Sequence, residues 1–344
     1  MRENHEILRA APLLNAAGDL NEPGWASSPL PVYRRADVRA GKLRIKEWDY
    51  YLVTDGHIGL ALTISDNGYM GLDSVSFLDF DGKWERTKSP MRLLPLGKTG
   101  LPESSAEGVS EIARGGYALA FYHEDGARRL SFHMENFLDG DMIEGVVTLT
   151  DAPKQSMVIA TPFDKPKHFY YNQKINCMRA EGWIQLGKRR IELTPDRFFA
   201  VLDWGRGVWT YHNTWYWGSA SGELDGVPFG WNIGYGFGDT SAASENVLFY
   251  GGKIHKLSQV RFEIPMQDGK EDYLAPWRFS SDDGRFEMAF TPILNRVAYT
   301  SVGVIKSDQN QVFGRFTGTA ALDDGTVLQV NDFFGFAEKV ENKW

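Results

Sequence analysis

Hydrophobic and polar residues alternate along most of the chain with a period of two, the spacing of a half-buried β-strand. In the first half, the pattern predicts strands at Gly59 to Ile64, Ser74 to Phe80, Tyr117 to Phe121, Leu130 to Met134 and Met142 to Leu149. In the second half, it predicts strands at 184–186, 198–203, 214–221, 229–236, 246–250, 253–255, 259–264, 277–280, 286–292, 313–322 and 327–334. Turn signals such as Asp-Asn-Gly at 66–68 separate the strands. Only residues 5–16 and the segment near Leu257 favour helix.

Many short antiparallel strands predict an all-β fold made of barrels or sandwiches. A length of 344 residues suggests about two domains. The least strand-like joint is Asp151 to Lys167, where proline and charged residues flank one apolar strand. We therefore expect an N-terminal β-barrel domain at residues 1–160 and a C-terminal β-barrel domain at residues 161–344.

Composition and charge exclude several classes of function. The net charge is -8 and no block of basic residues stands out, which argues against a nucleic-acid partner or a polybasic membrane anchor. No apolar run approaches the roughly 18 residues of a membrane span, and the N-terminus lacks the apolar core of a signal peptide. Cys177 is the only cysteine, so no disulfide can form within the chain. We expect a cytoplasmic protein, monomeric or homodimeric.

No motif in the sequence indicates a cofactor or a metal. The seven histidines form neither an H-x-H nor an H-E-x-x-H pattern. The G-x-S-x-G elbow of serine hydrolases and the Walker loop are both missing from the sequence. Gly-Tyr-Gly-Phe-Gly at 234–238 lacks the strand-then-helix context of a dinucleotide fingerprint. We expect neither a cofactor nor a metal site.

Several long motifs carry a resemblance to a known family. They are GDLNEPGW (18–25), KEWDYYLVT (46–54), FYYNQK (169–174), DWGRG (203–207), WYWG (215–218), WNIGYGFG (231–238), SENVLFYGGKIHKL (244–257) and GFAE (335–338). On these motifs the chain resembles, nearly end to end, the bacterial family described as domain of unknown function 2804 (DUF2804). That family is distantly similar to the carotenoid 1,2-hydratase and AttH-like group. The resemblance implies two tandem lipocalin-like antiparallel β-barrels, and it implies little about function.

Asp203 is the first candidate for chemistry, because it follows the apolar run Phe198 to Leu202. A buried carboxyl group far from cations keeps its proton near neutral pH and suits a general acid. Arg206 lies three residues further on, across an expected turn at DWGRG, and an Asp203–Arg206 ion pair would make both residues structural. The ion pair is the favoured alternative.

Aromatic residues provide candidate walls for a ligand. Trp215 and Trp217 lie on one face of a predicted strand, where their indole rings could hold an apolar ligand and face a developing positive charge. Trp231 and Tyr235 alternate with Asn232 and small glycines in the next strand. A packed core is the alternative for these rings. The empty face of that strand would let a ligand or another backbone come close.

Four more residues complete the candidate site. His212 could transfer a proton near neutral pH, although a surface position is the commoner role. The hydratase-like relatives carry a histidine, as the resemblance suggests, where this chain has Trp215, and this difference weakens the hydratase interpretation. Glu245 is a second candidate acid or base, with a cap on its hairpin as the alternative. Lys174 could pair with Glu245 or Asp203. Tyr171 stands beside it in FYYNQK, while Trp48 is interpreted as structural.

These residues favour two functions over a purely structural protein. The first is an enzyme that adds water to an alkene, or guides a cyclisation, in a lipophilic isoprenoid-like or polyketide-like substrate. Asp203, Glu245 and His212 would be its acids or bases. The walls of its site would be Trp215, Trp217 and Tyr235, and Arg206, Asn232 or Lys174 would orient the substrate. The second is a carrier that binds the same lipophilic small molecule without reaction. Both functions need a pocket inside a barrel that side chains do not fill.

Overall fold

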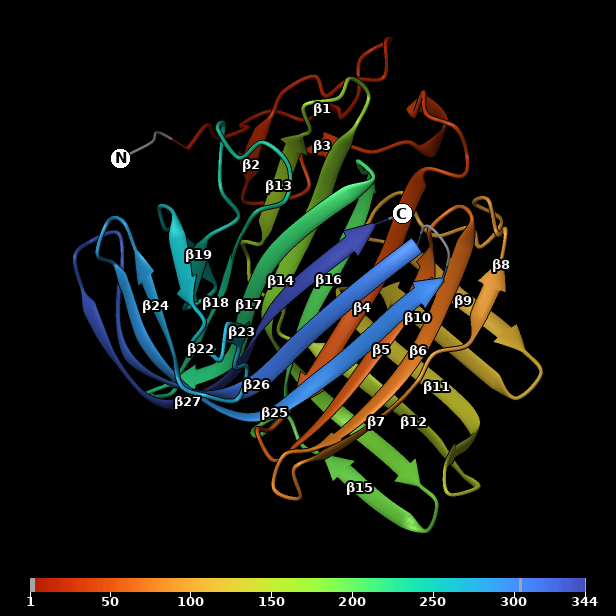
Figure 1. Cartoon of the computed structure of the whole chain (residues 1–344), viewed down its shortest axis with the longest axis vertical. Helices are drawn as coiled ribbons and strands as arrows, with labels where there is room; N and C mark the ends of the chain where they lie inside the picture. The colour runs from red at the N-terminus through yellow and green to blue at the C-terminus, as the bar shows by residue number, and fades with distance from the viewer. Residues whose placement is uncertain (1–3, 303–304, 344) are drawn as a thin grey trace.

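The computed structural model describes residues 4–302 and 305–343 of the chain. Within these ranges the chain folds into two large antiparallel sheets, each curled around its own apolar core (Figure 1). Two short strand pairs accompany them: β1 (Ala11–Pro12) with β3 (Pro31–Val32), and β22 (Met266–Gln267) with β23 (Lys270–Glu271). The expectation of an all-β fold is confirmed.

The first sheet has 14 strands. They are β2 (Gly24–Ala26), β4 (Ile45–Thr54), β5 (Ile58–Asp66), β6 (Met70–Asp79), β7 (Trp84–Lys88), β8 (Met91–Leu93), β9 (Gly108–Arg114), β10 (Tyr117–Glu124), β11 (Ala127–Leu138), β12 (Asp141–Thr150), β13 (Met157–Pro162), β14 (Phe169–Leu186), β15 (Arg189–Leu193) and β16 (Phe199–Val208). Its main path runs β7-β6-β5-β4-β16-β14-β12-β11-β10-β9.

The second sheet has nine strands, in the order β20-β19-β18-β17-β27-β26-β25-β24-β21. They are β17 (His212–Leu224), β18 (Val227–Tyr235), β19 (Val247–Tyr250), β20 (Lys253–Lys256), β21 (Val260–Glu263), β24 (Trp277–Ser281), β25 (Phe286–Val302), β26 (Ile305–Ala321) and β27 (Val327–Lys343). The chain passes from one sheet to the other between Val208 and His212. Strands β14 to β16, which the sequence analysis placed in the C-terminal domain, therefore pair within the first sheet.

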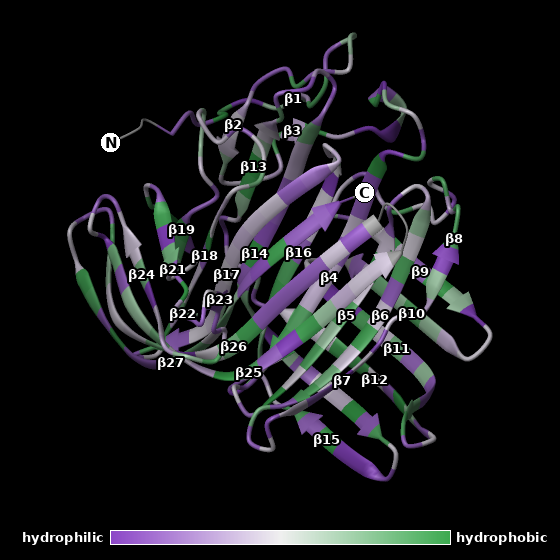
Figure 2. Cartoon of the chain, viewed as in Figure 1, coloured by the Kyte–Doolittle hydropathy of each residue, from purple (hydrophilic) through white to green (hydrophobic). Residues whose placement is uncertain are grey.

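The period-two pattern produces the alternating burial that it predicts. Along β12, residues that face the core alternate with residues that face outward, and Figure 2 shows the matching change of hydropathy along the strands. Strand β16 differs, because all of its residues are buried. One of its faces packs on the core of the first sheet and the other faces the second sheet. The long strands β25 and β26 cross in front of β4 to β6 and close this contact (Figure 1).

Three local expectations are wrong. Residues 5–16 are not helical, because their backbone groups pair with other segments: Ile7 N donates to Trp25 O and Leu13 N to Val32 O. Nor is there a helix at Leu257, and the one helical turn in the described ranges is the 3-10 turn η1 (Arg35–Asp37). DWGRG is not a turn, since β16 continues through it. Gly205 is needed there because a Cβ atom would lie 1.9 Å from Trp48 Cζ2.

Candidate active site

Two rows of directly paired residues face each other where the sheets meet. In the first sheet, Asp203 of β16 lies between Lys174 of β14 and Tyr50 of β4. In the second sheet, Glu338 of β27 lies between Trp217 of β17 and Gln311 of β26. The register of the strands therefore places an acid and a cation on one side of the interface, and an acid and an amide on the other.

Asp203 forms an ion pair with Lys174, its neighbour in the first row, rather than with Arg206. Its Oδ1 lies 2.9 Å from Lys174 Nζ and accepts a hydrogen bond of 2.5 Å from Asn172 Nδ2. All three residues are buried. The predicted Asp203–Arg206 pair is wrong, because residues three apart in a continuous strand point to opposite faces of the sheet. The alternative pairing of Lys174 with Asp203 is confirmed.

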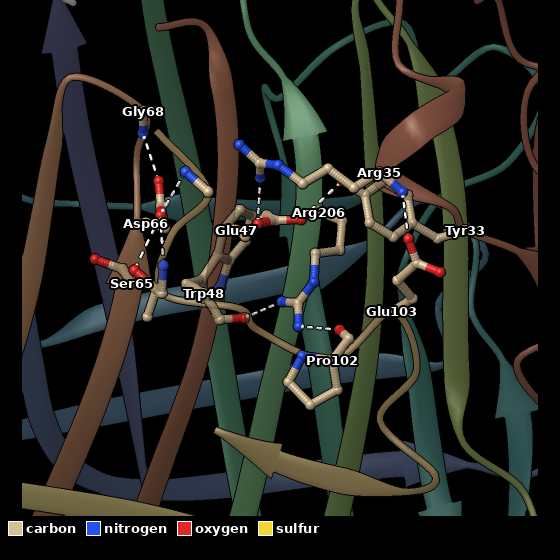
Figure 3. A network of polar contacts seen from close by, with 12 residues as sticks. Tyr33, Arg35, Glu47, Trp48, Ser65, Asp66, Gly68, Pro102, Glu103 and Arg206 are labelled. Carbon is tan, nitrogen blue, oxygen red and sulfur yellow. Dashed lines mark hydrogen bonds and ion pairs between the residues drawn. The ribbon is translucent and has the colours of Figure 1, made fainter. Parts of the chain in front are cut away.

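Arg206 lies in a separate polar network on the other face of β16. Its guanidinium group donates to Asp49 Oδ1 at 3.0 Å, to Trp48 O at 2.9 Å and to Pro102 O at 2.7 Å. Figure 3 shows the Arg206 bonds to Trp48 O and Pro102 O, and beside them the ion pair between Arg35 and Glu47. Each bond holds one strand or loop of the first sheet in place. We therefore assign Arg206 a structural role outside the candidate site.

Glu338 is the buried acid of the second row. Its Oε1 accepts a hydrogen bond of 3.1 Å from Trp215 Nε1, and its Oε2 accepts one of 3.1 Å from Gln311 Nε2. Burial raises the pKa of Glu338 to about 7, against the opposing effects of the Trp215 hydrogen bond and the Arg296 and Lys174 charges. The carboxyl group therefore holds or releases a proton near neutral pH.

Glu245 approaches the same interface from the loop that follows β18. Asn232 Nδ2 donates to Glu245 O at 2.9 Å and to its Oε2 at 3.2 Å, and Asn232 Oδ1 accepts from Trp217 Nε1 at 2.7 Å. Burial raises the pKa of Glu245, although Lys174 opposes the rise. The small face of β18 makes room for this carboxyl group, because a Cβ atom on Gly234 would lie 2.8 Å from Glu245 Oε1.

Asn172 Oδ1 is a buried polar atom of the interface with no hydrogen-bond partner in the described parts of the chain. Buried polar atoms are normally bonded, so this oxygen can accept a hydrogen bond from a water molecule or a polar ligand. Gln311 interacts with the Tyr50 hydroxyl, and this contact opposes the rise that burial causes in the pKa of Tyr50. Tyr170 adds a phenol whose pKa is raised well above its ordinary value, first by burial and then by the charges of Glu245 and Asp203.

The remaining predicted residues lie elsewhere. His212 is exposed at the start of β17, with its Nε2 atom 3.3 Å from Glu341 Oε1. Tyr171 faces the core of the first sheet and donates to Pro31 O at 2.6 Å. Tyr235 stacks on Tyr216 with ring centres 4.5 Å apart, on the opposite face from Trp217. These positions follow from the alternation of side chains along each strand.

The interior of the second barrel holds aromatic side chains rather than polar groups. Trp231 is fully buried there, with its ring centre 5.4 Å from Phe286 and 5.1 Å from Phe316. Trp215 and Trp217 do share a face, as predicted, but that face packs on the first sheet. Side chains therefore fill the second barrel around Trp231, which differs from the unfilled pocket expected from the sequence. Any ligand that contacts the Trp215 and Trp217 rings would lie between the barrels.

A separate open hollow of about 540 Å³ lies on the outer face of β9 to β12. Short side chains such as Ala118, Ala120 and Ser131 line it, and the ion pair between His133 and Glu144 borders it at 3.2 Å. A large hollow is often a ligand site. This one has few converging polar groups, whereas the interface joins several buried acids, so we place the candidate chemistry at the interface.

Glu338 and Gln311 are not among the residues predicted from the sequence, and Tyr170 stands there only as part of the motif FYYNQK. Tyr170 could have been found, because Tyr170, Asn172 and Lys174 alternate along β14 and must share one face. Glu338 and Gln311 required the register of β27 against β17 and β26. No local pattern in the sequence specifies that register.

The fold defines an all-β protein built from two tandem lipocalin-like antiparallel barrels. The family model described as Domain of unknown function (DUF2804) matches residues 4–344, and the chain belongs to this family. A crystal structure from Nitrosomonas europaea with the provisional name AttH is 12% identical, with a TM-score of 0.53, covering 92% of this chain and 98% of that one. Kievitone hydratase from Nectria haematococca is 7% identical, with a TM-score of 0.49, covering 97% and 98%. No curated protein matches the chain in sequence.

No helix in the described ranges is long and apolar enough to cross a membrane. The described residues also contain no group of three or more histidine, cysteine, aspartate or glutamate side chains placed to hold a metal ion. The comparison with the AttH structure supports the fold alone, because its identity is low. The function must therefore be argued from the interface residues themselves.

Proposed function

We propose that the chain binds a lipophilic small molecule between its two barrels and adds water across a carbon–carbon double bond of that molecule. The observation that carries the proposal is the position of Glu338. Its carboxyl group is buried, has a pKa of about 7, and lies across the interface from the Lys174–Asp203 ion pair. An acid with a pKa near the working pH is the most effective proton donor.

Asp203 and Glu338 have different roles in the proposed reaction because their surroundings differ. Asp203 is the counterion of Lys174, and Asn172 binds the same oxygen, so these groups form the fixed polar wall of the site. Among the described residues, Arg296 and Lys174 act on Glu338 through their charge without forming an ion pair with it, and Glu338 is the proton donor. Carboxyl groups with contrasting environments are a recurring arrangement in acid–base enzymes.

Glu338 and one water molecule account for every atom and proton in the proposed reaction. Glu338 gives its proton to one alkene carbon, and the oxygen of a water molecule forms a bond to the other carbon. The adding water then loses a proton to the Glu338 carboxylate, which restores the acid. The product is the alcohol, equal to the alkene plus one water. Asn172 Oδ1, which has no partner among the described residues, can accept a hydrogen bond from the water.

The indole rings have different parts in this proposal. The face of Trp217 is occupied by the Lys174 ammonium group, 3.9 Å from the ring centre, so Trp217 holds Lys174 in place. Trp215 contacts Glu338 directly, and its ring is the one that can lie beside positive charge developing on the alkene. The proposal therefore assigns substrate contact to Trp215 and positioning to Trp217.

The experiment is a turnover assay in oxygen-18-labelled water. Purified protein is incubated with a panel of isoprenoid and polyketide alkenes, and mass spectrometry looks for products that gain one labelled water. Glu338→Gln should abolish the gain, whereas Glu341→Gln on the same strand should leave it unchanged. Binding of an alkene without labelled product, in wild-type protein, would overturn the enzyme proposal and indicate a carrier.

A further inference from the structure

The side chain of Phe237 lies among four aromatic rings, which we call the aromatic cage, beside the carboxyl groups of the candidate site. Phe237 follows the end of β18, and its ring centre lies 4.9 Å from Tyr170, 4.9 Å from Trp209, 5.1 Å from Trp215 and 5.2 Å from Phe163. All four partners meet the Phe237 ring with steep interplanar angles of 66° to 88°. This edge-to-face geometry is the favoured one for binding an aromatic ring.

Two cage walls also belong to the candidate active site. Trp215 donates its indole N–H to Glu338, 3.1 Å away. Tyr170 lies on the same face of β14 as Lys174. The position of the Phe237 ring is therefore separated from the proton donor by a single side chain.

Two glycines flank Phe237 in the chain. Gly236 and Gly238 have φ angles of +91° and +75°, a conformation that other residues rarely adopt. A Cβ atom on Gly236 would lie 2.8 Å from Thr214 O, and one on Gly238 would lie 2.8 Å from Pro162 O, so both positions require glycine. Because glycine has the widest range of backbone angles, these two positions are where the chain beside Phe237 can change direction most easily.

Within the described ranges, backbone hydrogen bonds fix the loop from Asp239 onward. Asp239 N donates to Pro162 O at 2.7 Å, and further along Ala242 O accepts from His5 N at 2.8 Å. Ser244 N donates to Asn4 Oδ1 at 2.9 Å. Rotation about Gly236 and Gly238 can therefore move the Phe237 ring while Ala242 and Ser244 stay in place.

We propose that Phe237 is a displaceable stopper, and that the cage it fills binds an aromatic ring of the substrate. The substrate class is then a lipophilic alkene that also carries a phenyl-sized ring. Its ring replaces Phe237 between Trp209, Trp215 and Tyr170, and its double bond extends toward Glu338. This inference rests on the proposed function for the reacting end of the molecule, but ring binding itself does not need catalysis.

Fluorine NMR tests the displacement in nearly native protein. 4-Fluorophenylalanine is placed at position 237 in the Glu338→Gln background, and styrene is the probe. On saturation with styrene, the fluorine signal should move to the position of a solvent-exposed ring. The same label at Phe290, in the core of the second barrel, should not shift. Two results would overturn the proposal that Phe237 is displaced. One is styrene binding with no shift of the fluorine signal at position 237, and the other is no styrene binding at all.

A second variant measures the cost of displacement. Phe237→Ala should bind styrene about tenfold more tightly than wild type or better, because the open state no longer has to be populated. Phe163→Ala removes a wall of the cage and should weaken binding instead. Equal styrene affinity in wild type and Phe237→Ala would contradict the proposal. Since the fluorine assay uses an inactive background, ring binding can succeed even if hydration fails, and the two failures are separable.

Discussion

The Lys174 ammonium group lies 3.9 Å from the centre of the Trp217 ring and 2.9 Å from Asp203 Oδ1. Lys174 and Asp203 belong to the first sheet, whereas Trp217 belongs to the second. The lysine therefore joins the two barrels through one charged group. A cation held between an aromatic face and a carboxylate is stabilised by both, which offsets part of the cost of its burial.

Removal of either charge should destabilise the protein more than removal of both. Lys174→Met leaves Asp203 buried without its cation, and we expect a loss of about 3 kcal/mol in the free energy of unfolding. The Lys174→Met/Asp203→Asn double variant should recover part of this loss. Urea denaturation of the four proteins in a double-mutant cycle measures the coupling.

An exposed ion pair supplies the control for this cycle. Arg190 Nε lies 2.6 Å from Glu192 Oε1, but the two side chains are 50% and 63% exposed. Arg190→Met should therefore change the free energy of unfolding by less than about 1 kcal/mol. A Lys174→Met effect of the same small size would show that the buried pair does not join the barrels.

Stability should fall as the pH rises through the range in which Glu338 titrates. The pKa of Glu338 is about 7 in the folded protein, above its ordinary value of 4.5 in an unfolded chain. The unfolded state then binds fewer protons than the folded state between these values, so the free energy of unfolding decreases with rising pH. Each unit of raised pKa corresponds to about 1.4 kcal/mol.

Urea denaturation between pH 5 and pH 8 checks this dependence. Glu338→Gln should reduce the slope, because the glutamine carries no proton that titrates. Some slope should remain, since the pKa of Glu245 is also raised. Glu341→Gln is the matched control and should leave the slope as it is in wild type. An identical slope in wild type and Glu338→Gln would refute the raised pKa.

The close packing of Trp48 on β16 predicts that Gly205→Ala is strongly destabilising. The new methyl group would lie 1.9 Å from Trp48 Cζ2, so either the ring or the strand has to move. Overpacking of this kind costs about 1–3 kcal/mol. Gly41 has no atom within 4 Å of its ideal Cβ position, and Gly41→Ala should be nearly neutral. Thermal unfolding of both variants measures the difference.

The sequence predicts the all-β class well, because the alternation of apolar and polar residues is a local property of each strand. The faces of the strands are also predictable: Trp215 and Trp217 do point the same way, and Asn232 points opposite to Trp231. The two-barrel arrangement came from family resemblance rather than from periodicity. The predicted domain boundary between residues 160 and 161 rests on the proline and charged residues of Asp151 to Lys167, whereas the first sheet continues to Val208.

The site could be predicted only in part, because its two rows come from different sheets. Lys174 and Asp203 were each recognised as candidates, and their pairing was one of the weighed alternatives. Glu338 stands in the last strand, and nothing near it in the sequence indicates that it faces Lys174. The Asp203–Arg206 pair failed because glycine in DWGRG was interpreted as a turn, while Gly205 serves to admit the Trp48 ring.

Trp215→Phe should raise the pKa of Glu338 further. The Trp215 Nε1–H group donates to Glu338 Oε1 at 3.1 Å, and this bond lowers the pKa by favouring the carboxylate. Phenylalanine keeps a ring in the cage but has no N–H donor, so the carboxyl group should retain its proton to a higher pH. Carbon-13 NMR of labelled glutamate side chains should show the Glu338 titration midpoint moving upward from about 7. Trp183→Phe, on the outer face of the first sheet, is the control and should leave the midpoint in place. A midpoint that stays or falls in Trp215→Phe would mean that the indole does not set the acidity of Glu338.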